Sequence, residues 1–324
     1  MHTTKTQPVP TPPPNTRTPA RGSSVRGHSV RGVRWAWLCV VGLVVGACGG
    51  GEAPRSEPVG RVVEVPGVFV EVSAGYSHSC GLRDDATIAC WGDNSVGQLG
   101  APAGRYSTVS AGNYFTCALR EDATIACWGT NYSGESDPPE GRYTAVAASV
   151  ANACALRPDG YADCWGSDSD PSTRPPPWRF AAIDLRPVLS CGLRVDGIIK
   201  CWGLELFEAL PGEPVGRFDR LAVGLYALCG VDTEGTVACT SQNRIEPRPE
   251  RFADVSVGWE HACGVRLDGS LQCWGDNSYG RADPPGGQFE AVTAGGEHSC
   301  GLRVDGTVTC WGAVGFAQRH RGEF

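Results

Sequence analysis

The sequence predicts an all-β repeat protein, and three observations support this class. The chain of 324 residues is rich in turn-forming residues, with 44 Gly and 24 Pro. Fourteen of its 16 cysteines form seven pairs with nine residues between partners, and the first members recur every 34 to 38 residues. The segments around each pair alternate apolar and polar residues, as half-buried strands do. A period of about 37 residues indicates modules that bury their faces against one another.

Each module is predicted to hold three short strands. In the last copy these are residues 289–295 (FEAVTAG), 298–303 (HSCGLR) and 307–311 (TVTCW). Val304, Asp305 and Gly306 separate the second strand from the third, which is typical of a type I turn closed by a left-handed residue. The left-handed position holds Gly306, Gly269, Gly197 and Gly160 in four copies, and Ala86 and Ala123 in the first two. Alanine costs about 1 kcal/mol in that conformation.

The cysteines of each pair are predicted to face each other across this hairpin. Counting outward from the turn places Cys300 opposite Cys310, at a non-hydrogen-bonded site where Cα atoms approach to about 4.5 Å, close enough for a disulfide. The predicted disulfides join Cys80 to Cys90, Cys117 to Cys127, Cys154 to Cys164, Cys191 to Cys201, Cys229 to Cys239, Cys263 to Cys273, and Cys300 to Cys310. Zinc is the alternative, but isolated pairs without further ligands would leave each metal under-coordinated, so no metal is expected.

The N-terminal region predicts export. Residues 1–34 are basic and rich in Pro, Thr and Ser, and a run of 13 mostly apolar residues (35–47, WAWLCVVGLVVGA) follows them. This run has the length of a signal-peptide core and is too short to span a membrane as a mature helix. Its end, Val45-Gly46-Ala47-Cys48, resembles the lipobox of bacterial lipoproteins, which implies lipidation at Cys48 and an anchor in the cell envelope. Ordinary signal cleavage with an incidental Cys48 is the alternative.

These features divide the chain into three parts. Residues 1–47 are predicted to be a disordered basic leader with a lipoprotein signal peptide, 48–61 a flexible tether, and 62–324 the repeat domain. Removing residues 1–47 takes away six of the 28 basic side chains and none of the 35 acidic ones, so the net charge falls from −7 to −13. Such an acidic domain repels phosphate backbones, which argues against nucleic-acid binding.

The repeats resemble those of the regulator of chromosome condensation family. The first copy reads AGYSHSCGLRDDATIACWGDNSVGQLG (residues 74–100), and six copies have Trp-Gly after the second cysteine. The resemblance covers about residues 68–324 and implies a seven-bladed β-propeller of about 37-residue repeats. The short period and paired cysteines are similar to compact bacterial members, among them the type II β-lactamase inhibitor protein. The eukaryotic namesake is a nucleotide-exchange factor, an activity that would require a cytosolic location.

Two further expectations concern the ring. The recurring His78, His261 and His298 are interpreted as structural, each with a hydrogen bond between strands rather than a catalytic role. Because a propeller must join its first and last copies, residues 62–65 are expected to supply an extra strand that links the two ends.

The strand directions place two loops of each module on one face, opposite the Asp-Gly turns. These are the loop before the second strand and the loop after Trp-Gly, and aromatic side chains among adaptable polar ones suit a protein-binding surface. The candidate partner-binding rim is Tyr76, Asp93, Asn94, Tyr114, Tyr226, Trp259, Asp276 and Asn277. The Asp-Asn loops lack the carboxylate spacing of a calcium site.

The sequence therefore predicts a lipid-anchored, extracytoplasmic binding scaffold for a protein partner, without catalysis or cofactor. No nucleophile-base pairing, phosphate-binding loop or zinc-protease motif stands apart from the repeat. The alternatives are a propeller enzyme that acts on envelope glycans and, less favoured, an exchange-type regulator. An enzyme would gather carboxylates of raised pKa near the central channel.

Overall fold

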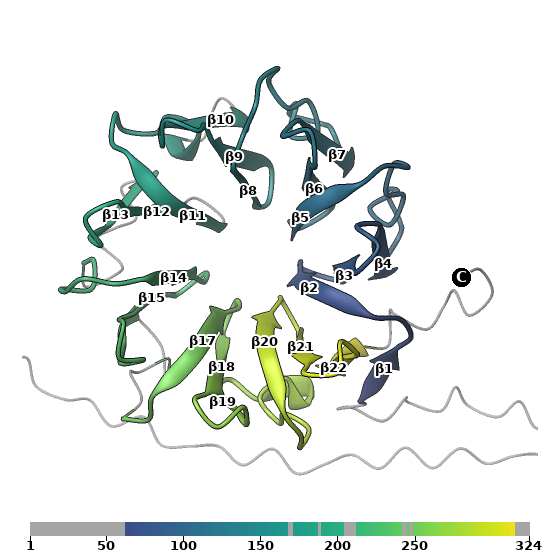
Figure 1. Cartoon of the computed structure of the whole chain (residues 1–324), viewed down its shortest axis with the longest axis vertical. Helices are drawn as coiled ribbons and strands as arrows, with labels where there is room; N and C mark the ends of the chain where they lie inside the picture. Colours follow the sequence, from purple (N-terminus) through teal and green to yellow (C-terminus); the bar gives the residue numbers. More distant parts are fainter. Residues whose placement is uncertain are drawn as a thin grey trace, which may run out of the picture. The chain divides into compact units, whose positions relative to one another are not determined.

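Seven small antiparallel sheets surround a central axis in the repeat domain (Figure 1). The structure, a computed structural model, describes residues 62–167, 171–186, 189–203, 212–241, 245 and 249–314. The predicted leader, the tether and Cys48 lie outside these residues, as does the end of the chain from residue 315. The predicted class, an all-β propeller of seven blades, is confirmed for the described part of the chain.

Each blade has three strands in chain order, and the last blade has a fourth. The strands are β1 (Val63–Val65), β2 (Phe69–Ala74), β3 (His78–Arg83), β4 (Ile88–Gly92), β5 (Tyr106–Ala111), β6 (Phe115–Arg120), β7 (Ile125–Gly129), β8 (Ala145–Ala148), β9 (Asn152–Leu156), β10 (Ala162–Gly166), β11 (Phe180–Arg186), β12 (Leu189–Arg194), β13 (Ile199–Gly203), β14 (Arg220–Val223), β15 (Ala227–Val231), β16 (Val237–Ser241), β17 (Phe252–Val257), β18 (His261–Arg266), β19 (Leu271–Gly275), β20 (Phe289–Ala294), β21 (His298–Arg303) and β22 (Val308–Gly312). Blade 1 is β2 to β4, and blade 7 is β20 to β22 with β1 added.

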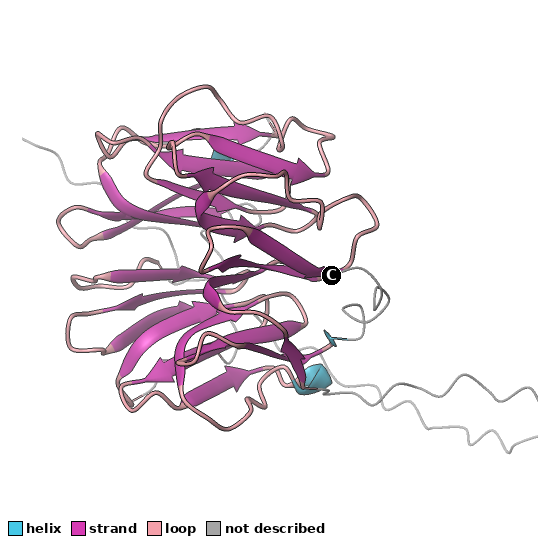
Figure 2. Cartoon of the chain, turned by 45° about the vertical axis from the view of Figure 1, so that its right-hand side comes forward, coloured by secondary structure: helices cyan, strands magenta, loops and turns pink. Residues whose placement is uncertain are grey.

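Helical structure in the described residues is limited to short turns such as η1 (Pro171–Thr173) and η3 (Ser278–Gly280), as Figure 2 shows. No helix among these residues has both the length and the apolar character needed to cross a membrane. Loops join the strands and form both faces of the ring.

The innermost strands close the ring. β2, β5, β8, β11, β14, β17 and β20 each contact the next one, and β20 contacts β2 (Figure 1). The hydrophobic core lies at the seams between blades. At one seam, Cys80 and Leu82 of blade 1 pack with Tyr106, Val109 and Trp128 of blade 2. Because each blade buries its faces only against its neighbours, the seams hold the ring together.

The predicted hairpin is present in every blade. Ala86 and Ala123 adopt φ values of 66° and 69° at the left-handed position, and Gly306 adopts 81°. Carboxylates brace several of these turns: Asp85 Oδ1 accepts hydrogen bonds from the main-chain N–H and the hydroxyl of Thr87, at 2.9 and 2.6 Å. This is the local bonding that favours aspartate in turns.

The turn sets the register that the cysteines require. The two cysteines of each pair lie directly opposite each other in all seven hairpins. The paired Cα atoms lie 3.9 to 4.1 Å apart, and every predicted pair forms a disulfide. The disulfides join Cys80 to Cys90, Cys117 to Cys127, Cys154 to Cys164, Cys191 to Cys201, Cys229 to Cys239, Cys263 to Cys273, and Cys300 to Cys310. Each blade is thus latched by its own disulfide.

The two cysteines of a pair differ in exposure, a difference that the sequence interpretation did not anticipate because it treated them as equivalent. The first cysteine of each pair is on the middle strand of its blade and is fully buried. The second is on the outer strand and is only half-buried in six blades, at Cys90, Cys127, Cys164, Cys201, Cys239 and Cys273. In blade 7, where β1 adds a further strand outside β22, Cys310 is buried. The disulfide is therefore partly exposed to solvent wherever the outer strand forms the edge of its sheet.

The chain closes its ring with the expected extra strand. β1 pairs antiparallel with the outer strand of blade 7, with Val63 opposite Cys310 and Val65 opposite Val308. Val65 is buried against Phe69 and Trp91 of blade 1 and Leu302 of blade 7. A segment that precedes blade 1 in sequence therefore completes blade 7 in space.

Candidate partner-binding site

Two loops of each blade start on the same face, as expected from the strand directions. We call the loop before the middle strand the incoming loop and the loop after Trp-Gly the outgoing loop. Their main chains are hydrogen-bonded at the base: the Asp93 N–H donates to the Ser77 carbonyl at 3.0 Å, and the Asp276 N–H donates to the Glu260 carbonyl at 2.8 Å. The candidate rim residues therefore share one face of the ring.

Three of the predicted aromatic residues meet on that face. The Tyr76 ring lies 4.4 Å from the Trp259 ring and 6.3 Å from the Tyr114 ring, centroid to centroid. They come from the incoming loops of blades 1, 6 and 2, and we call Tyr76, Tyr114 and Trp259 the mouth cluster. Tyr114 is 39% exposed. Tyr226, in the incoming loop of blade 5, is partly buried and has no ring contact with this cluster among the described residues.

The main chains of these loops approach those of the neighbouring blades closely. The Tyr76 N–H donates to the Gly112 carbonyl of blade 2, and the Trp259 N–H donates to the Gly295 carbonyl of blade 7, at 3.2 and 3.3 Å. A Cβ atom at Gly75 would lie 2.1 Å from the Gly112 carbonyl oxygen, so only glycine permits this approach. The repeated glycine before the loop thus draws adjacent incoming loops toward the axis.

Blade 4 places Arg186 at this glycine position, which the sequence interpretation missed. Its Nε donates to the Val223 carbonyl of blade 5 at 2.7 Å, and its Nη2 donates to the Val257 carbonyl of blade 6 at 3.0 Å. The side chain crosses two seams and lines the same pocket as Tyr76 and Trp259. The signal was available, because a long cationic residue replaces glycine in one copy of a repeat.

The pocket beneath the mouth cluster has a volume of about 20 Å³, room for about one water molecule. Ser149 Oγ and Asn113 Oδ1 line it and have no hydrogen-bond partner among the described residues, although both atoms are buried. Buried polar atoms without partners are costly. The pocket therefore offers hydrogen-bonding groups under an aromatic surface.

The Asp-Asn residues of the rim are hydrogen-bonded within their own loops. Asp93 accepts from Ser95 and from Gln98 Nε2 at 2.9 Å, and Asn94 Oδ1 accepts from the Leu99 N–H at 3.1 Å. In blade 6, Asp276 pairs with Arg281, and Asn277 Oδ1 accepts from the Ala282 N–H at 2.9 Å. A hydrogen bond from Ser278 lowers the pKa of Asp276, and a smaller contribution comes from Arg281. These four side chains shape their own outgoing loops, and none of them lines the pocket beneath the mouth cluster.

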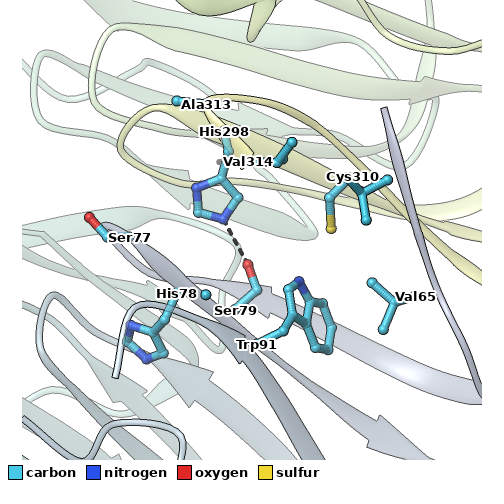
Figure 3. Close-up of a pocket in the computed structure, with 11 residues that line it drawn as sticks. Val65, Ser77, His78, Ser79, Trp91, His298, Cys310, Ala313 and Val314 are labelled. Carbon is cyan, nitrogen blue, oxygen red and sulfur yellow. Dashed lines mark hydrogen bonds between the residues drawn. The ribbon is translucent and has the colours of Figure 1, made fainter. Parts of the chain in front are cut away.

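The three histidines connect neighbouring blades, which confirms their expected hydrogen bonding. His78 Nε2 lies 2.8 Å from Thr116 Oγ1, and His261 Nε2 lies 2.7 Å from Ser299 Oγ. His298 Nε2 lies 2.7 Å from Ser79 Oγ, across the seam between blades 7 and 1 (Figure 3). Burial lowers the pKa of His78 and His298 to about 4 and that of His261 to about 3. All three rings are therefore neutral at pH 7.

Three partly buried carboxyl groups have raised pKa values, and each lies on an innermost strand of a different blade. Burial raises the pKa of Glu71, Asp184 and Asp254. Each accepts a main-chain N–H from the next blade, from Val109, Val223 and Val292 respectively. They belong to separate seams, and none of the three lines the pocket beneath the mouth cluster. No group of three or more His, Cys, Asp or Glu side chains suited to a metal occurs among the described residues.

The fold and the site define the class: a seven-bladed, disulfide-latched β-propeller that presents an aromatic cluster at the mouth of its axis. Four segments match the family described as the regulator of chromosome condensation (RCC1) repeat: residues 69–98, 106–135, 252–281 and 289–315. These four segments are repeats of this family's type, as the sequence resemblance implied. No curated protein matches the chain.

Solved structures with similar folds include two receptor-kinase ectodomains and yeast RCC1. The CRINKLY WD40 ectodomain of the Arabidopsis thaliana receptor kinase ACR4 shares 27% identity with a TM-score of 0.66, over 78% of this chain and 98% of that one. The ectodomain of the Physcomitrella patens receptor kinase CR4 shares 24% identity with a TM-score of 0.66, over 76% and 75%. Yeast RCC1 (Prp20), solved with Kap60, shares 15% identity with a TM-score of 0.58, over 75% and 80%.

Proposed function

We propose that this protein is an extracytoplasmic scaffold that binds a protein partner at the mouth cluster and performs no chemistry of its own. The observation that carries the proposal is the convergence of Tyr76, Tyr114 and Trp259 from three blades on one face. The closed propeller, with a disulfide in every blade, holds the three aromatic side chains in place before binding. Preorganised aromatic side chains lose little conformational entropy on binding, which is why they dominate protein interfaces.

The net charge of the chain and the Glu297 carboxylate near Tyr76 favour a partner with a basic surface. Burial raises the pKa of Tyr76, and the nearby Glu297 carboxylate adds to that rise. The chain after residue 47 would carry a net charge of −13. Complementary charge speeds association and selects partners, while the aromatic centre supplies most of the affinity. We therefore propose that the partner presents an apolar or aromatic side chain within a basic patch.

The proposed location rests on the disulfides and on the N-terminal sequence. Seven structural disulfides persist in an oxidising compartment and not in the cytosol. The ectodomain of the ACR4 receptor kinase, at 27% identity, is a similar propeller on the outer side of a membrane. We propose that Cys48 carries the lipid that anchors the scaffold. Absence of labelled palmitate on the wild-type chain, or its retention in Cys48→Ser, would refute the anchor.

Photo-crosslinking in the exported protein tests the binding site. A crosslinking amino acid at position 114 should form a covalent adduct with one partner, and adding Tyr76→Ala and Trp259→Ala should reduce that adduct at least tenfold. Tyr132 provides the matched control, because it is 89% exposed in an outgoing loop outside the cluster. An adduct that survives both substitutions, or that Tyr132→Ala reduces equally, would overturn the proposed site.

A further inference from the structure

Two neighbouring blades replace the glycine that begins each incoming loop. This position holds Gly75, Gly112, Gly224, Gly258 and Gly295 in five blades, Ser149 in blade 3 and Arg186 in blade 4. The side chains of Ser149 and Arg186 both line the pocket beneath the mouth cluster, together with Asn113 of blade 2. The pocket therefore has an aromatic side, from blades 1 and 6, and a polar side, from blades 2, 3 and 4.

The main chain around this pocket forms its own hydrogen bonds. The Tyr76 N–H donates to the Gly112 carbonyl at 3.2 Å, and the Asn113 N–H donates to the Ser149 carbonyl at 2.7 Å. The equivalent bond joins the incoming loops at three further seams. Because these main-chain groups are already paired, a ligand in the pocket would be recognised by side chains.

Arg186 is a partly buried cation with no carboxylate at ion-pair distance among the described residues. Its Nε and Nη2 donate to the neutral carbonyls of Val223 and Val257, and its Nη1 has no acceptor among these residues. Arg281, by contrast, pairs with the Glu260 carboxylate at 2.8 Å. A cation that is withdrawn from water without a counter-charge is unfavourable, so Arg186 favours an anionic ligand.

Ser149 supplies a second donor to the same pocket. The residue is only 4% exposed, and its Oγ has no hydrogen-bond partner among the described residues. The Asn113 amide is beside it and presents either its oxygen or, after rotation, its NH₂ group. These groups surround a volume of about 20 Å³, enough for about one oxygen atom with its hydrogen-bond partners. The pocket therefore suits the end of a side chain.

We propose that this pocket binds one oxygen of an aspartate or glutamate carboxylate of the partner, with Arg186 Nη1 and the Ser149 hydroxyl as donors. The inference rests on the proposed function, because the carboxylate belongs to the protein that binds the mouth cluster. The methylene groups of the same side chain then pack against Tyr76 and Trp259. Hydrogen bonds between a guanidinium and a carboxylate are about twice as strong as neutral ones.

The charge of the chain selects a carboxylate over a more highly charged anion. The acidic surface repels a phosphate more strongly than a singly charged carboxylate, while it attracts the basic residues around that carboxylate. The partner is therefore expected to present one acidic side chain inside its basic patch. Arg186 then determines specificity, because it is the cation that meets this side chain.

A titration with two small probes tests the chemistry of the pocket. N-acetylglutamate amide carries the proposed carboxylate, and N-acetylglutamine amide is its neutral counterpart of the same shape. In NMR spectra of the exported protein with isotope-labelled tryptophan, the glutamate probe should shift the indole signal of Trp259, assigned with Trp259→Phe. The glutamine probe should not shift it. Equal shifts from the two probes, or no shift from either, would overturn the proposal.

Substitutions assign the two donors. Arg186→Gln should weaken binding of the glutamate probe at least about tenfold, because a charged hydrogen bond is lost. Ser149→Gly introduces the residue that five blades carry, so the fold should tolerate it while binding weakens several-fold. Arg217→Gln is the matched control, because it removes the same charge from an exposed residue beside the turn at Gly197. An equal loss in Arg217→Gln, or no loss in Ser149→Gly, would contradict the assigned contacts.

The crosslinking assay at position 114 shows whether the carboxylate comes from the partner. Arg186→Gln should reduce the adduct at least about tenfold, as the two aromatic substitutions do. An adduct that resists Arg186→Gln but is lost with Tyr76→Ala and Trp259→Ala would refute the carboxylate and leave the proposed binding site intact. If the glutamate probe binds while the adduct resists, the pocket serves a free small carboxylate, which would also overturn the proposal.

Discussion

At the scale of single residues, the polar side chains at the seams act mainly in pairs that cross from one blade to the next. His78, His261 and His298 each meet a Ser or Thr hydroxyl of the neighbouring blade, and that hydroxyl lies 3.6 Å from a cystine sulfur of the histidine's own blade. The recurrence of histidine is thereby explained by packing. Its neutral ring links two blades without burying a charge.

The lowered histidine pKa values predict that acid weakens the seams. Between pH 6.5 and about 4, the unfolded histidine binds a proton while the buried His298 ring does not, so stability falls as the pH falls through this window. His298→Phe, which copies the Phe115 of blade 2, should therefore flatten the dependence of unfolding free energy on pH between 7 and 5. The measurement is urea unfolding at several pH values, with wild type as reference.

The partly buried Glu71, Asp184 and Asp254 do not interfere with this test. Burial raises the pKa of these groups in the folded state, so their protonation stabilises the fold as the pH falls, opposite in sign to the histidines. These three carboxyl groups are present in both wild type and His298→Phe, so their contribution cancels when the two pH profiles are compared. Parallel pH profiles for the variant and wild type would contradict the assigned role of His298.

A few residues show where prediction from the sequence stops. The turn positions of Ala86 and Ala123 were predictable, because hairpin geometry depends only on neighbouring residues. The contact between Tyr76 and Trp259 was not, because it depends on the ring's curvature across blades 6, 7 and 1. The replacement of glycine by Arg186 was visible in the repeat, but its two acceptors were not predictable, because they lie 37 and 71 residues away along the chain.

At the scale of elements, the hairpin between the middle and outer strands carries most of the local information. Its three-residue turn fixes the register, and the register places the two cysteines opposite each other. The disulfide then joins the two strands at this non-hydrogen-bonded pair. Strand bounds in the last copy were predicted to within one residue, since local alternation sets them. The outgoing loops were less predictable, because their Asp and Asn side chains fold back on the loop itself.

The alanines in the left-handed turn position predict a stabilising substitution. Ala86→Gly removes the strain of a Cβ atom at φ 66°, which outweighs the extra freedom of glycine in the unfolded chain. We expect a gain of about 0.5–1 kcal/mol in the free energy of unfolding, measured by urea denaturation. Gly160→Ala is the matched reverse change, at φ 85° with its nearest contact at 3.3 Å, and should cost about 1–2 kcal/mol. A destabilised Ala86→Gly would contradict the strain argument.

At the scale of the whole molecule, the ring depends on the meeting of its two ends. β1 was expected from the need to close the ring, and it pairs with β22 at the edge of blade 7. The sheets of the other six blades end at their outer strands, so β1 serves to join the two ends of the chain rather than to hide an edge. Val65 of β1 packs against Phe69 and Trp91 of blade 1 and Leu302 of blade 7, and closure therefore stabilises the fold.

Substitutions in β1 test this closure. Val65 is buried between blades 1 and 7, whereas Glu64 on the same strand is exposed. Val65→Asp should lower the free energy of unfolding by about 2–3 kcal/mol, because it buries a charge at the seam. Glu64→Gln should change it by less than about 0.5 kcal/mol. Thermal unfolding of both variants decides the matter, and equal melting temperatures would show that β1 is dispensable.

The most direct test of the central claim, an exported propeller latched blade by blade, is peptide mapping of the protein purified from the cell envelope without reductant. Alkylation before digestion should label none of the 14 repeat cysteines, including the half-buried outer members such as Cys90 and Cys273. Each cysteine should be recovered in a disulfide with the partner ten residues away. Free thiols at these positions, or disulfides that join different blades, would contradict the account.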